Sequence, residues 1–554
     1  MTIQVQTDQQ INPTHDWRVS LIQSINRSNS HIVLALTGGG QVLGDLLSFA
    51  GISATLLEAT VTYSPESMHN YIGYTPDQYC CRQTACQMAM TAFNRSIKII
   101  RTRKNNQNPN TNLTQNLHDN NLHYANNNYS QINLSRRKIQ QHDQTTLDDF
   151  SNLIGVGCAV SLATNYEKRG GHRVYVAVQT LRSTFAFSLE LNKDERMRNE
   201  EDRLVADLIL GAIGVACDDL ELWRGKVVAE VETVKELDNK FFDAFEYSSN
   251  AGDDLKAKIP LALKSGETVE SLKVVASPLL LDLFFGKSKA VLWSQGKIRY
   301  FQQNSENKTP DTVANAVTNT VVNTVANTAV KSDVLQTSCV QTDSVLCEDV
   351  EVVEGDLKSG GRDNVQVGSA ADCVFNRYAE YMQAIFPGAF NPVHLGHLGM
   401  KRFAERRLGC RVALEISISN TDKPMVDYID LWFRLCEIER ACSDQIVWLT
   451  QTPLFEEKSE IFRGATFIVG ADTLRRFADV CKYYRNTHHL HDVLRIIAYY
   501  DCRFLVFARR RDNITESLNS LNIPDMLRSL CDEVLESEFT ENISSTELRK
   551  KREK

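Results

Sequence analysis

The chain has 554 residues and a mass of 62.5 kDa, a length sufficient for about three or four domains. An apolar fraction of 42%, a net charge of −8 and a pI near 5.9 are typical of globular proteins and exclude a general attraction to nucleic acids or anionic membranes. No apolar run reaches the roughly 18 residues of a membrane span, and the polar N-terminus lacks a signal-peptide pattern. The 14 cysteines contain no CxxC pair, which favours reduced thiols in a cytoplasmic or nuclear protein over a disulfide scaffold or a zinc site.

The first half of the chain alternates apolar strand-like runs with helical patterns. Strands are predicted over residues 31–36, 56–63, 154–163 and 174–179, and helices over residues 84–99 and 203–217. This alternation is typical of a wound α/β domain, which we assign to residues 1–245. Residues 246–301 contain short alternating runs and a glycine turn, and we expect a small accessory segment that packs on a neighbouring domain.

Two segments have a composition unlike the rest of the chain. In residues 104–147, 18 of 44 residues are Asn or Gln, and residues 302–372 contain a four-residue repeat from Thr312 to Lys331. Polar tracts of this kind bury too little apolar surface to offset the loss of chain entropy. We therefore predict a disordered insertion at 104–147 and a disordered linker at 302–372, with a docking helix as the alternative for the repeat.

The last part of the chain, residues 373–554, has the most regular pattern. Strands are predicted at residues 383–386, 412–418, 446–450, 466–469 and 503–507, and each is followed by a helical pattern. This succession predicts a doubly wound, Rossmann-like parallel sheet, whose ligands bind at the carboxyl ends of the strands. The predicted fold class is thus α/β, with this domain and a separate N-terminal α/β domain joined by the disordered linker.

A Pro/Gly loop with two histidines follows the first of these strands. Its sequence is FPGAFNPVHLGH, from Phe386 to His397. Gly388 allows close approach of backbone and ligand, and Pro392 suits the first turn of a helix. His394 and His397 are then three positions apart on one face of that turn, where a helix N-terminus attracts anions. Two imidazoles there can donate hydrogen bonds to phosphate oxygens and stabilise moving charge, whereas the alternative is a pair of surface histidines.

This string resembles the first signature of the nucleotidyltransferase superfamily of adenylyl- and cytidylyltransferases. Near the C-terminus, ISSTELR from Ile543 to Arg549 resembles the second signature, ISSTxxR, although alone it would equally suit a helix cap before a basic tail. The resemblance covers about residues 380–554. It implies catalytic roles for His394, His397, Lys423 and Arg549. It also implies nucleotide binding by Gly388, Ala389, Phe390, Asn391, Gly396, Gly470, Asp472, Thr473, Ser544, Ser545 and Thr546.

The string FIVGADT, which ends at Thr473, narrows the expected acceptor. It resembles the strand-end segment of nicotinamide or nicotinate mononucleotide adenylyltransferases, and this resemblance implies that Asp472 accepts hydrogen bonds from sugar hydroxyls. The alternative is an aspartate that caps the next helix. The family also places a basic residue on phosphate just beyond the second strand, where this chain has Lys423.

The aromatic side chain that stacks on the pyridine ring in that family is not assigned by the sequence. The candidates are Phe477, Tyr483 and Tyr484. The three arginines at 509–511 follow the last predicted strand, and we interpret them as a solvated charge run, with a phosphate contact as the alternative.

Residues 31–102 and 148–245 resemble the domain at the C-terminus of competence-damage-inducible proteins, which acts as a nicotinamide mononucleotide amidohydrolase. The matching pieces include TGG at 37–39 and VTYS at 61–64. The family's reactive serine corresponds to Ala35 and its lysine to Met68, so the nucleophile and its base are missing. We expect a non-catalytic domain, which either holds an oligomer together or binds a phosphate through backbone N–H groups of its TGGG loop. The alternative is that a displaced residue such as Ser64 supplies the chemistry.

The two resemblances together imply a cytoplasmic two-module enzyme that transfers AMP from ATP to nicotinamide or nicotinate mononucleotide. Mg²⁺ is the expected cofactor, bound mainly through the ATP phosphates. The expected partners are ATP and a pyridine mononucleotide, without nucleic acid or membrane, and a homo-oligomer is compatible with the sequence. A fragment that starts near residue 375 is predicted to keep the activity. The alternatives are cytidylyl transfer or another acceptor, and a non-catalytic nucleotide-binding regulator.

Overall fold

The computed structural model describes most of the chain outside the two segments of unusual composition. The described residues are 16–107, 147–166, 168–231, 242–300, 380–420, 423–479, 487–511, 514–540, 545 and 548–549. The predicted linker 302–372 and the Asn/Gln-rich segment from residue 108 therefore lie outside the described residues, as do Ser544, Thr546, Tyr483 and Tyr484. Among the described helices, none is long and apolar enough to cross a membrane.

The N-terminal module, residues 16–276, is built on a mixed seven-stranded sheet of order β2-β1-β3-β4-β5-β8-β7. Only the pairs β1–β2 and β1–β3 are parallel, whereas β3, β4, β5, β8 and β7 follow one another antiparallel. A wound, parallel arrangement is thus confined to three strands, because the remaining strands of the sheet pair antiparallel. The bounds are β1 His31–Leu36, β2 Leu56–Val61, β3 Leu153–Ser161, β4 His172–Gln179, β5 Ser183–Leu191, β7 Phe245–Ser248 and β8 Val269–Ala276.

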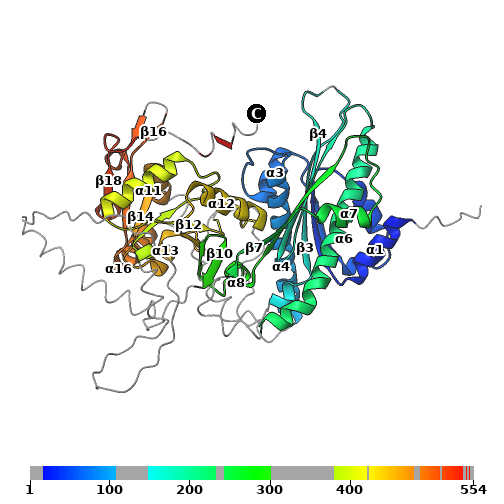
Figure 1. Ribbon diagram of the computed structural model, residues 1–554, viewed down its shortest axis with the longest axis horizontal. Helices are drawn as coiled ribbons and strands as arrows, with labels where there is room; N and C mark the ends of the chain where they lie inside the picture. The colour runs from blue at the N-terminus through cyan, green and yellow to red at the C-terminus, as the bar shows by residue number, and fades with distance from the viewer. Residues whose placement is uncertain are drawn as a thin grey trace, which may run out of the picture. The chain divides into compact units, whose positions relative to one another are not determined.

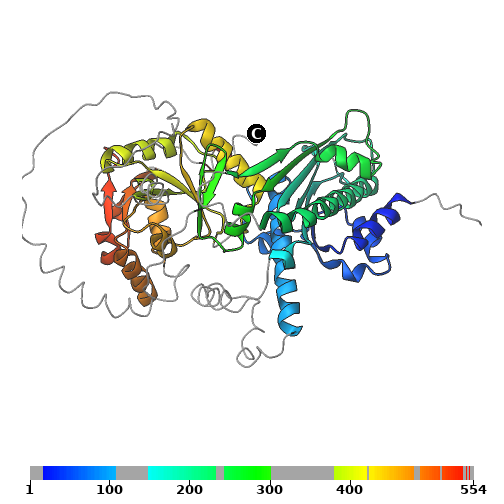
Figure 2. The same ribbon diagram turned by 60° about the horizontal axis from the view of Figure 1, so that its bottom comes forward.

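Two long helices cover opposite faces of this sheet, α4 (Arg82–Gln107) and α6 (Arg198–Val231) (Figure 1). Helix α4 packs so closely that a Cβ at Gly157 would lie 2.2 Å from the Ala85 carbonyl oxygen, so β3 requires glycine there. The helix continues to Gln107, beyond the predicted end at residue 99 (Figure 2). The shorter helices are α1 Trp17–Arg27, α2 Gln41–Leu47, η1 Ile52–Ala54, α3 Pro65–Ile72, η4 Leu147–Phe150 and α7 Ala251–Lys258.

The C-terminal module, residues 290–300 and 380–549, supplies every strand except the edge strand β6 to the second sheet, of order β18-β15-β14-β11-β12-β13-β9-β10-β6. Six strands from β18 to β13 are parallel, which confirms the predicted doubly wound fold. Their chain order reverses between β11 and β14, which is where ligands bind in such sheets. The bounds are β6 Phe242–Asp243, β9 Ala290–Ser294, β10 Lys297–Tyr300, β11 Ala384–Pro387, β12 Ala413–Ser417, β13 Val447–Thr450, β14 Thr466–Gly470, β15 Arg503–Phe507 and β18 Cys531–Val534.

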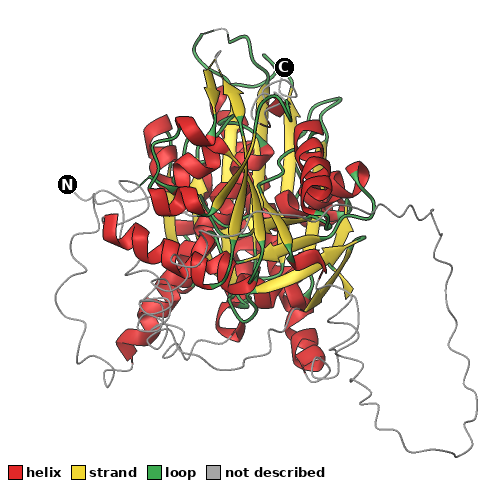
Figure 3. Cartoon of the chain, turned by 90° about the vertical axis from the view of Figure 1, so that its left-hand side faces the viewer, coloured by secondary structure: helices red, strands yellow, loops and turns green. Residues whose placement is uncertain are grey.

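Helices flank the strands of the structure on both sides (Figure 3). A separate two-stranded ladder joins β16 (Arg509–Arg511) to β17 (Ile514–Glu516). The helices of the C-terminal module are η6 Glu380–Met382, α11 Leu395–Leu408, α12 Tyr428–Ala441, α13 Phe455–Ile461, α14 Ala471–Phe477, α16 Thr487–Tyr499, η7 Leu518–Ser520 and α17 Asp525–Ser529.

The segment 246–301 belongs to both sheets. Its first part supplies β7, α7 and β8 to the N-terminal sheet, and its last part supplies β9 and β10, a hairpin whose β9 pairs antiparallel with β13. Helix α8 (Pro278–Phe284) joins the two parts. Further contacts tie α12 to the N-terminal module: the Tyr428 hydroxyl donates to the Leu181 carbonyl at 2.6 Å, and the Tyr247 ring stacks on Trp432 at 4.7 Å.

Candidate active site

The loop from Gly388 to His394, which we call the phosphate loop, leaves the carboxyl end of β11. The Gly388 N–H donates to the Glu415 carbonyl of β12 at 2.9 Å. A Cβ at Gly388 would lie 2.7 Å from the buried ring of Phe390, whose φ is +45°. The sequence predicted that this glycine makes room for a ligand, whereas in the structure it makes room for the Phe390 ring.

The two histidines of the motif lie against each other at the start of α11. The helix begins at Leu395, so Pro392 precedes it instead of occupying its first turn, and His394 is the N-cap residue with φ −149° and ψ 171°. The Nδ1 atom of His394 accepts a hydrogen bond from the His397 backbone N–H at 3.4 Å. The two rings stack with centroids 3.7 Å apart, so both imidazoles are presented at the amino end of this helix.

Aromatic neighbours and burial keep both imidazoles neutral at physiological pH. The His397 ring meets Phe390 edge-on at 5.0 Å and Phe386 at 5.9 Å. Burial, with smaller effects of the His394 and Arg509 charges, lowers the pKa of His397 to about 3. Burial and Arg509 also lower the pKa of His394. Neutral rings can donate hydrogen bonds, but positive charge for a phosphate has to come from other side chains.

Arg549 brings the second motif onto the phosphate loop. Its Nη1 donates to the Asn391 carbonyl oxygen, and the Ser545 hydroxyl donates to the Pro392 carbonyl at 3.1 Å. The two sequence motifs, which lie about 150 residues apart in the chain, therefore meet at one loop. Of the serine and threonine residues assigned to nucleotide binding in the second motif, Ser544 and Thr546 lie outside the described part of the chain.

Helix α12 fixes the middle of the phosphate loop. The Arg434 guanidinium donates to the Ala389 carbonyl at 3.1 Å and pairs with Asp430. The Asp430 carboxylate in turn accepts from the Asn391 side-chain amide at 3.1 Å. Gly396, also assigned to nucleotide binding, is buried in the first turn of α11.

Asp472 lies at the carboxyl end of β14, which is the neighbour of β11 in the sheet. It occupies the first turn of α14 together with Thr473, and a Cβ at Gly470 would lie 2.8 Å from its Oδ1 atom. Its Oδ2 atom is 3.2 Å from Nη1 of Arg509. Arg509 also lowers the pKa of both motif histidines, so it lies within electrostatic reach of the phosphate loop. From the sequence, Arg509 is interpreted as part of a solvated charge run. Its position shortly after β15, at the carboxyl end of that strand, is the signal that could have identified it as a site residue.

Lys423 follows β12 and lies 4.4 Å from the centroid of the Tyr74 ring, which belongs to the N-terminal module. Desolvation of the ammonium group, together with the charges of Arg549 and Arg434, lowers the pKa of Lys423, while Asp77 acts in the opposite direction. Lys423 thus lies near Arg549, Arg434 and Asp77.

Of the three aromatic candidates for pyridine stacking, only Phe477 is described. It is buried and packs edge-on against Phe455 at 5.2 Å, and it lies 5.8 Å from Phe504. Phe477 is therefore part of the core under α14 and does not present a face for stacking.

Residues 385–551 match the family model described as cytidylyltransferase-like. These residues are therefore similar to a nucleotidyltransferase domain. This domain is the C-terminal module without its β9–β10 hairpin, and the motif histidines, Arg549 and Asp472 all lie within it. Comparison of the chain with curated proteins gave no significant match. Among solved structures, the chain is similar to a competence/damage-inducible protein from Agrobacterium tumefaciens, with 16% identity, a TM-score of 0.22, and coverage of 39% of this chain and 99% of that one.

In the N-terminal module, the positions expected for a serine–lysine pair are part of the core. Ala35 lies in β1 and is fully buried, and Met68 of α3 is 2% exposed. Ser64, the alternative nucleophile, is the N-cap of α3, and its hydroxyl accepts from the Ser67 N–H at 3.2 Å. Ala35 and Met68 therefore belong to the hydrophobic core, and Ser64 caps a helix.

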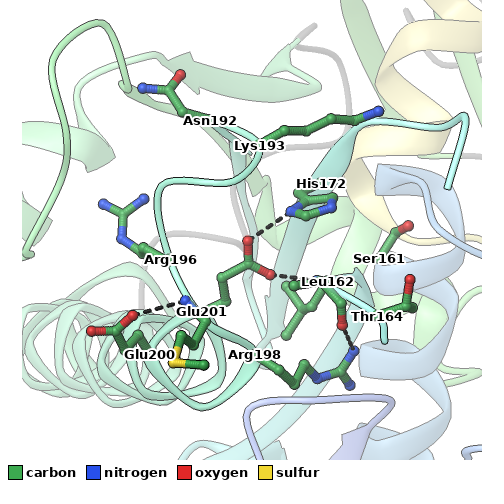
Figure 4. Close-up of polar contacts among 12 residues, drawn as sticks. Ser161, Leu162, Thr164, His172, Asn192, Lys193, Arg196, Arg198, Glu200 and Glu201 are labelled. Atoms are coloured by element: carbon green, nitrogen blue, oxygen red, sulfur yellow. Dashed lines mark hydrogen bonds and ion pairs between the residues drawn. The ribbon is translucent and has the colours of Figure 1, made fainter. Parts of the chain in front are cut away.

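A carboxylate of α6 accepts hydrogen bonds from backbone N–H groups of the loop at which a phosphate was expected. Asp202 accepts from the Gly39 N–H at 2.6 Å and from the Gln41 N–H at 3.3 Å, at the TGGG loop. Figure 4 shows the next carboxylate, Glu201, which pairs with His172 at 2.7 Å and accepts from the Ala163 N–H at 2.6 Å. The Asp202 carboxylate thus takes up two backbone N–H groups at the TGGG loop, the loop that was expected to meet a phosphate.

The loop after β3 carries one further polar pair. The Lys168 ammonium donates to the Ser161 hydroxyl at 2.7 Å and to the Leu162 carbonyl at 2.8 Å. Across the described residues of both modules, no group of three or more His, Cys, Asp or Glu side chains is placed to hold a metal ion.

Proposed function

We propose that the nucleotidyltransferase domain transfers AMP from ATP to the 5′-phosphate of nicotinamide or nicotinate mononucleotide, with release of pyrophosphate. The observation that carries the proposal is the stacked pair His394–His397 at the amino end of α11, with the Arg549 guanidinium bound to the same loop. Hydrogen-bond donors, a helix terminus and a cation converge there at the point where the strand order reverses.

The reaction is an in-line displacement. An oxygen of the acceptor phosphate forms a bond to the α-phosphorus of ATP, and the bond from that phosphorus to the bridging oxygen of the β-phosphate breaks. Pyrophosphate takes the electron pair, and no covalent intermediate with the protein is needed. The protein therefore acts by positioning and by stabilising charge.

Each residue of the site has a role in this scheme. The neutral imidazoles of His394 and His397 donate hydrogen bonds to the triphosphate, together with backbone N–H groups of the phosphate loop. Lys423 and Arg549 neutralise the charge that develops on the pyrophosphate. Mg²⁺ would be carried by the phosphates and water and would neutralise further charge.

The choice of a pyridine mononucleotide as acceptor rests on the segment FIVGADT. Asp472 at the end of β14 accepts hydrogen bonds from the sugar hydroxyls in this proposal, and its contact with Arg509 orients the carboxylate. A different nucleotide donor or phosphorylated acceptor is the second candidate, because the matched family model is described as cytidylyltransferase-like.

The test is pyrophosphate release by the full chain from ATP or CTP, each with nicotinamide mononucleotide, nicotinate mononucleotide, or a phosphorylated compound without a pyridine ring. We expect release with ATP and at least one pyridine mononucleotide, and NAD or its deamido form as the product. Release with CTP, or only with acceptors that lack the pyridine, would assign the second candidate. Binding of nucleotides without any turnover would indicate a regulator.

A further inference from the structure

The N-terminal module reaches the phosphate loop through the segment between α3 and α4. This segment starts at Gly73, whose φ of +87° ends α3, and it contains Tyr74 and Asp77. It is fastened to the start of α4 by the Thr84 hydroxyl, which donates to the Gln78 carbonyl at 2.5 Å. Asp77 is therefore held on a short, anchored segment.

Asp77 binds the arginine of the second nucleotidyltransferase motif. Its Oδ2 atom accepts from Nε of Arg549 at 2.6 Å, while Nη1 of the same guanidinium donates to the Asn391 carbonyl oxygen. A guanidinium is planar, so two hydrogen bonds from different nitrogens fix the orientation of the whole group. One of these two bonds comes from the nucleotidyltransferase domain and the other from the N-terminal module.

Other contacts hold the two modules together around this pair. Arg82, at the start of α4, lies over the Phe433 ring of α12 at 4.7 Å. A cavity of about 300 Å³ is lined by residues of both modules, among them Arg82, Asn391 and Asp430. The Tyr74 ring lies beneath the Lys423 ammonium at 4.4 Å. The segment from Tyr74 to Asp77 thus touches both cations that the proposed reaction uses.

We infer that Asp77 is a positioning residue of the nucleotidyltransferase site: its carboxylate holds the Arg549 guanidinium on the phosphate loop before the nucleotide binds. This inference rests on the proposed function. A long arginine side chain loses much rotamer freedom when it binds phosphate, and an arginine that is already oriented loses less at that step. The N-terminal module therefore completes the site of the other module, although its own catalytic positions hold Ala35 and Met68.

The partial exposure of the Asp77–Arg549 pair favours a positioning role over a structural one. The Asp77 side chain is 33% exposed and the Arg549 side chain 23% exposed. Pairs that are partly exposed contribute little to global stability. A misplaced cation, in contrast, affects a transfer reaction strongly, because a displacement of about 1 Å can cost on the order of 10²-fold in rate.

The test compares full-length variants by steady-state kinetics, with the donor and acceptor that the wild type uses. Asp77→Asn keeps the size of the side chain and removes its charge, and Asp77→Glu keeps the charge. We expect D77N to lower kcat/KM for the nucleotide donor by roughly 10- to 10²-fold, with little change in KM for the acceptor and in thermal melting. D77E should recover most of the loss. Asp253→Asn, which removes a charge from an exposed helix of the same module, is the control and should behave as wild type.

Three outcomes would overturn the inference. The first is D77N with wild-type kinetics, and the second is D77N with tighter donor binding and faster turnover, which would mean that Asp77 masks Arg549. The third is a D77N loss that D77E does not recover and that a lowered melting temperature accompanies, which indicates a structural role. A wild type that releases no pyrophosphate with any pair contradicts the proposed function itself, whereas an active wild type with an unaffected D77N contradicts only this inference.

Discussion

His397 has aromatic rings on several sides, since Phe386, Phe390 and His394 all contact it. The low pKa of His397 therefore follows from burial among these rings and not from its place in the motif. A neutral imidazole with little access to water changes its hydrogen bonds little during the reaction, and such preorganised donors stabilise transferring charge well.

Replacing His397 by alanine should accordingly reduce turnover far more than stability. We expect His397→Ala to lower kcat by roughly 10²- to 10³-fold with retained far-UV circular dichroism. The matched control is His491→Ala on α16, another histidine of the same domain. A folded H397A variant with unchanged kcat would remove His397 from the catalytic residues.

The low pKa of His397 also predicts how stability depends on pH. In the unfolded chain the pKa of a histidine is near 6.5, whereas in the folded protein that of His397 is about 3. Between these values the unfolded state binds the additional proton, so this residue destabilises the fold as pH falls below about 6.5. Urea denaturation at pH 7.5 and pH 5 should show this as a loss of up to about 2 kcal/mol at pH 5.

His397→Gln provides the comparison, because glutamine keeps a polar side chain but does not titrate. The difference in unfolding free energy between pH 7.5 and pH 5 should be smaller in this variant than in the wild type. Equal differences in the two proteins would mean that His397 takes up its proton as readily in the folded state as in the unfolded one.

At the scale of elements, the β9–β10 hairpin decides where the C-terminal module begins. β9 pairs with β13 along four residue pairs, and its Trp293 is 2% exposed. A fragment that starts near residue 375 lacks this hairpin and leaves the edge of β13 open, which favours aggregation. The sequence predicted an active fragment, but the structure leads us to expect one that is unstable or insoluble.

Trp293→Ala in the full chain tests the same point without removing a segment. Loss of a buried tryptophan typically costs about 3–5 kcal/mol, so chemical denaturation should show a large shift of the C-terminal transition. Leu535→Ala, whose side chain is 48% exposed, is the control and should change stability little. A wild-type denaturation curve for W293A would show that the hairpin does not support the sheet.

At the scale of the whole molecule, the two resemblances found in the sequence raise the hypothesis that deamidation precedes adenylyl transfer. The buried Ala35 and Met68 argue against the first step. We therefore expect the full chain to release no ammonia from nicotinamide mononucleotide in a coupled assay. Ammonia release abolished by Ser161→Ala would contradict this, because it would assign the Ser161–Lys168 pair a catalytic role.

Much of the fold was predictable because its signals are local. β1 was predicted with its bounds, and the strands β11 to β15 within two residues, since short apolar runs bounded by turn residues mark buried strands. β5, β7 and β8 were not predicted as strands. β5 pairs antiparallel with β4 and β8, and β7 pairs antiparallel with β8, so these strands do not follow the alternation of helices and parallel strands on which the prediction relied.

The sequence by itself determined the features that depend on residues close together in the chain. These are the strand, loop and helix start that carry His394 and His397, and the presence of Ala35 and Met68 where a serine and a lysine were expected. The tertiary structure alone decided which distant groups complete or occupy these places. Arg509 reaches Asp472 from 37 positions away, Asp202 reaches Gly39 from 163, and Asp77 reaches Arg549 from 472. Sequence spacing carries no information about such pairs, because only the packing of the two sheets and their helices brings the side chains within hydrogen-bonding distance.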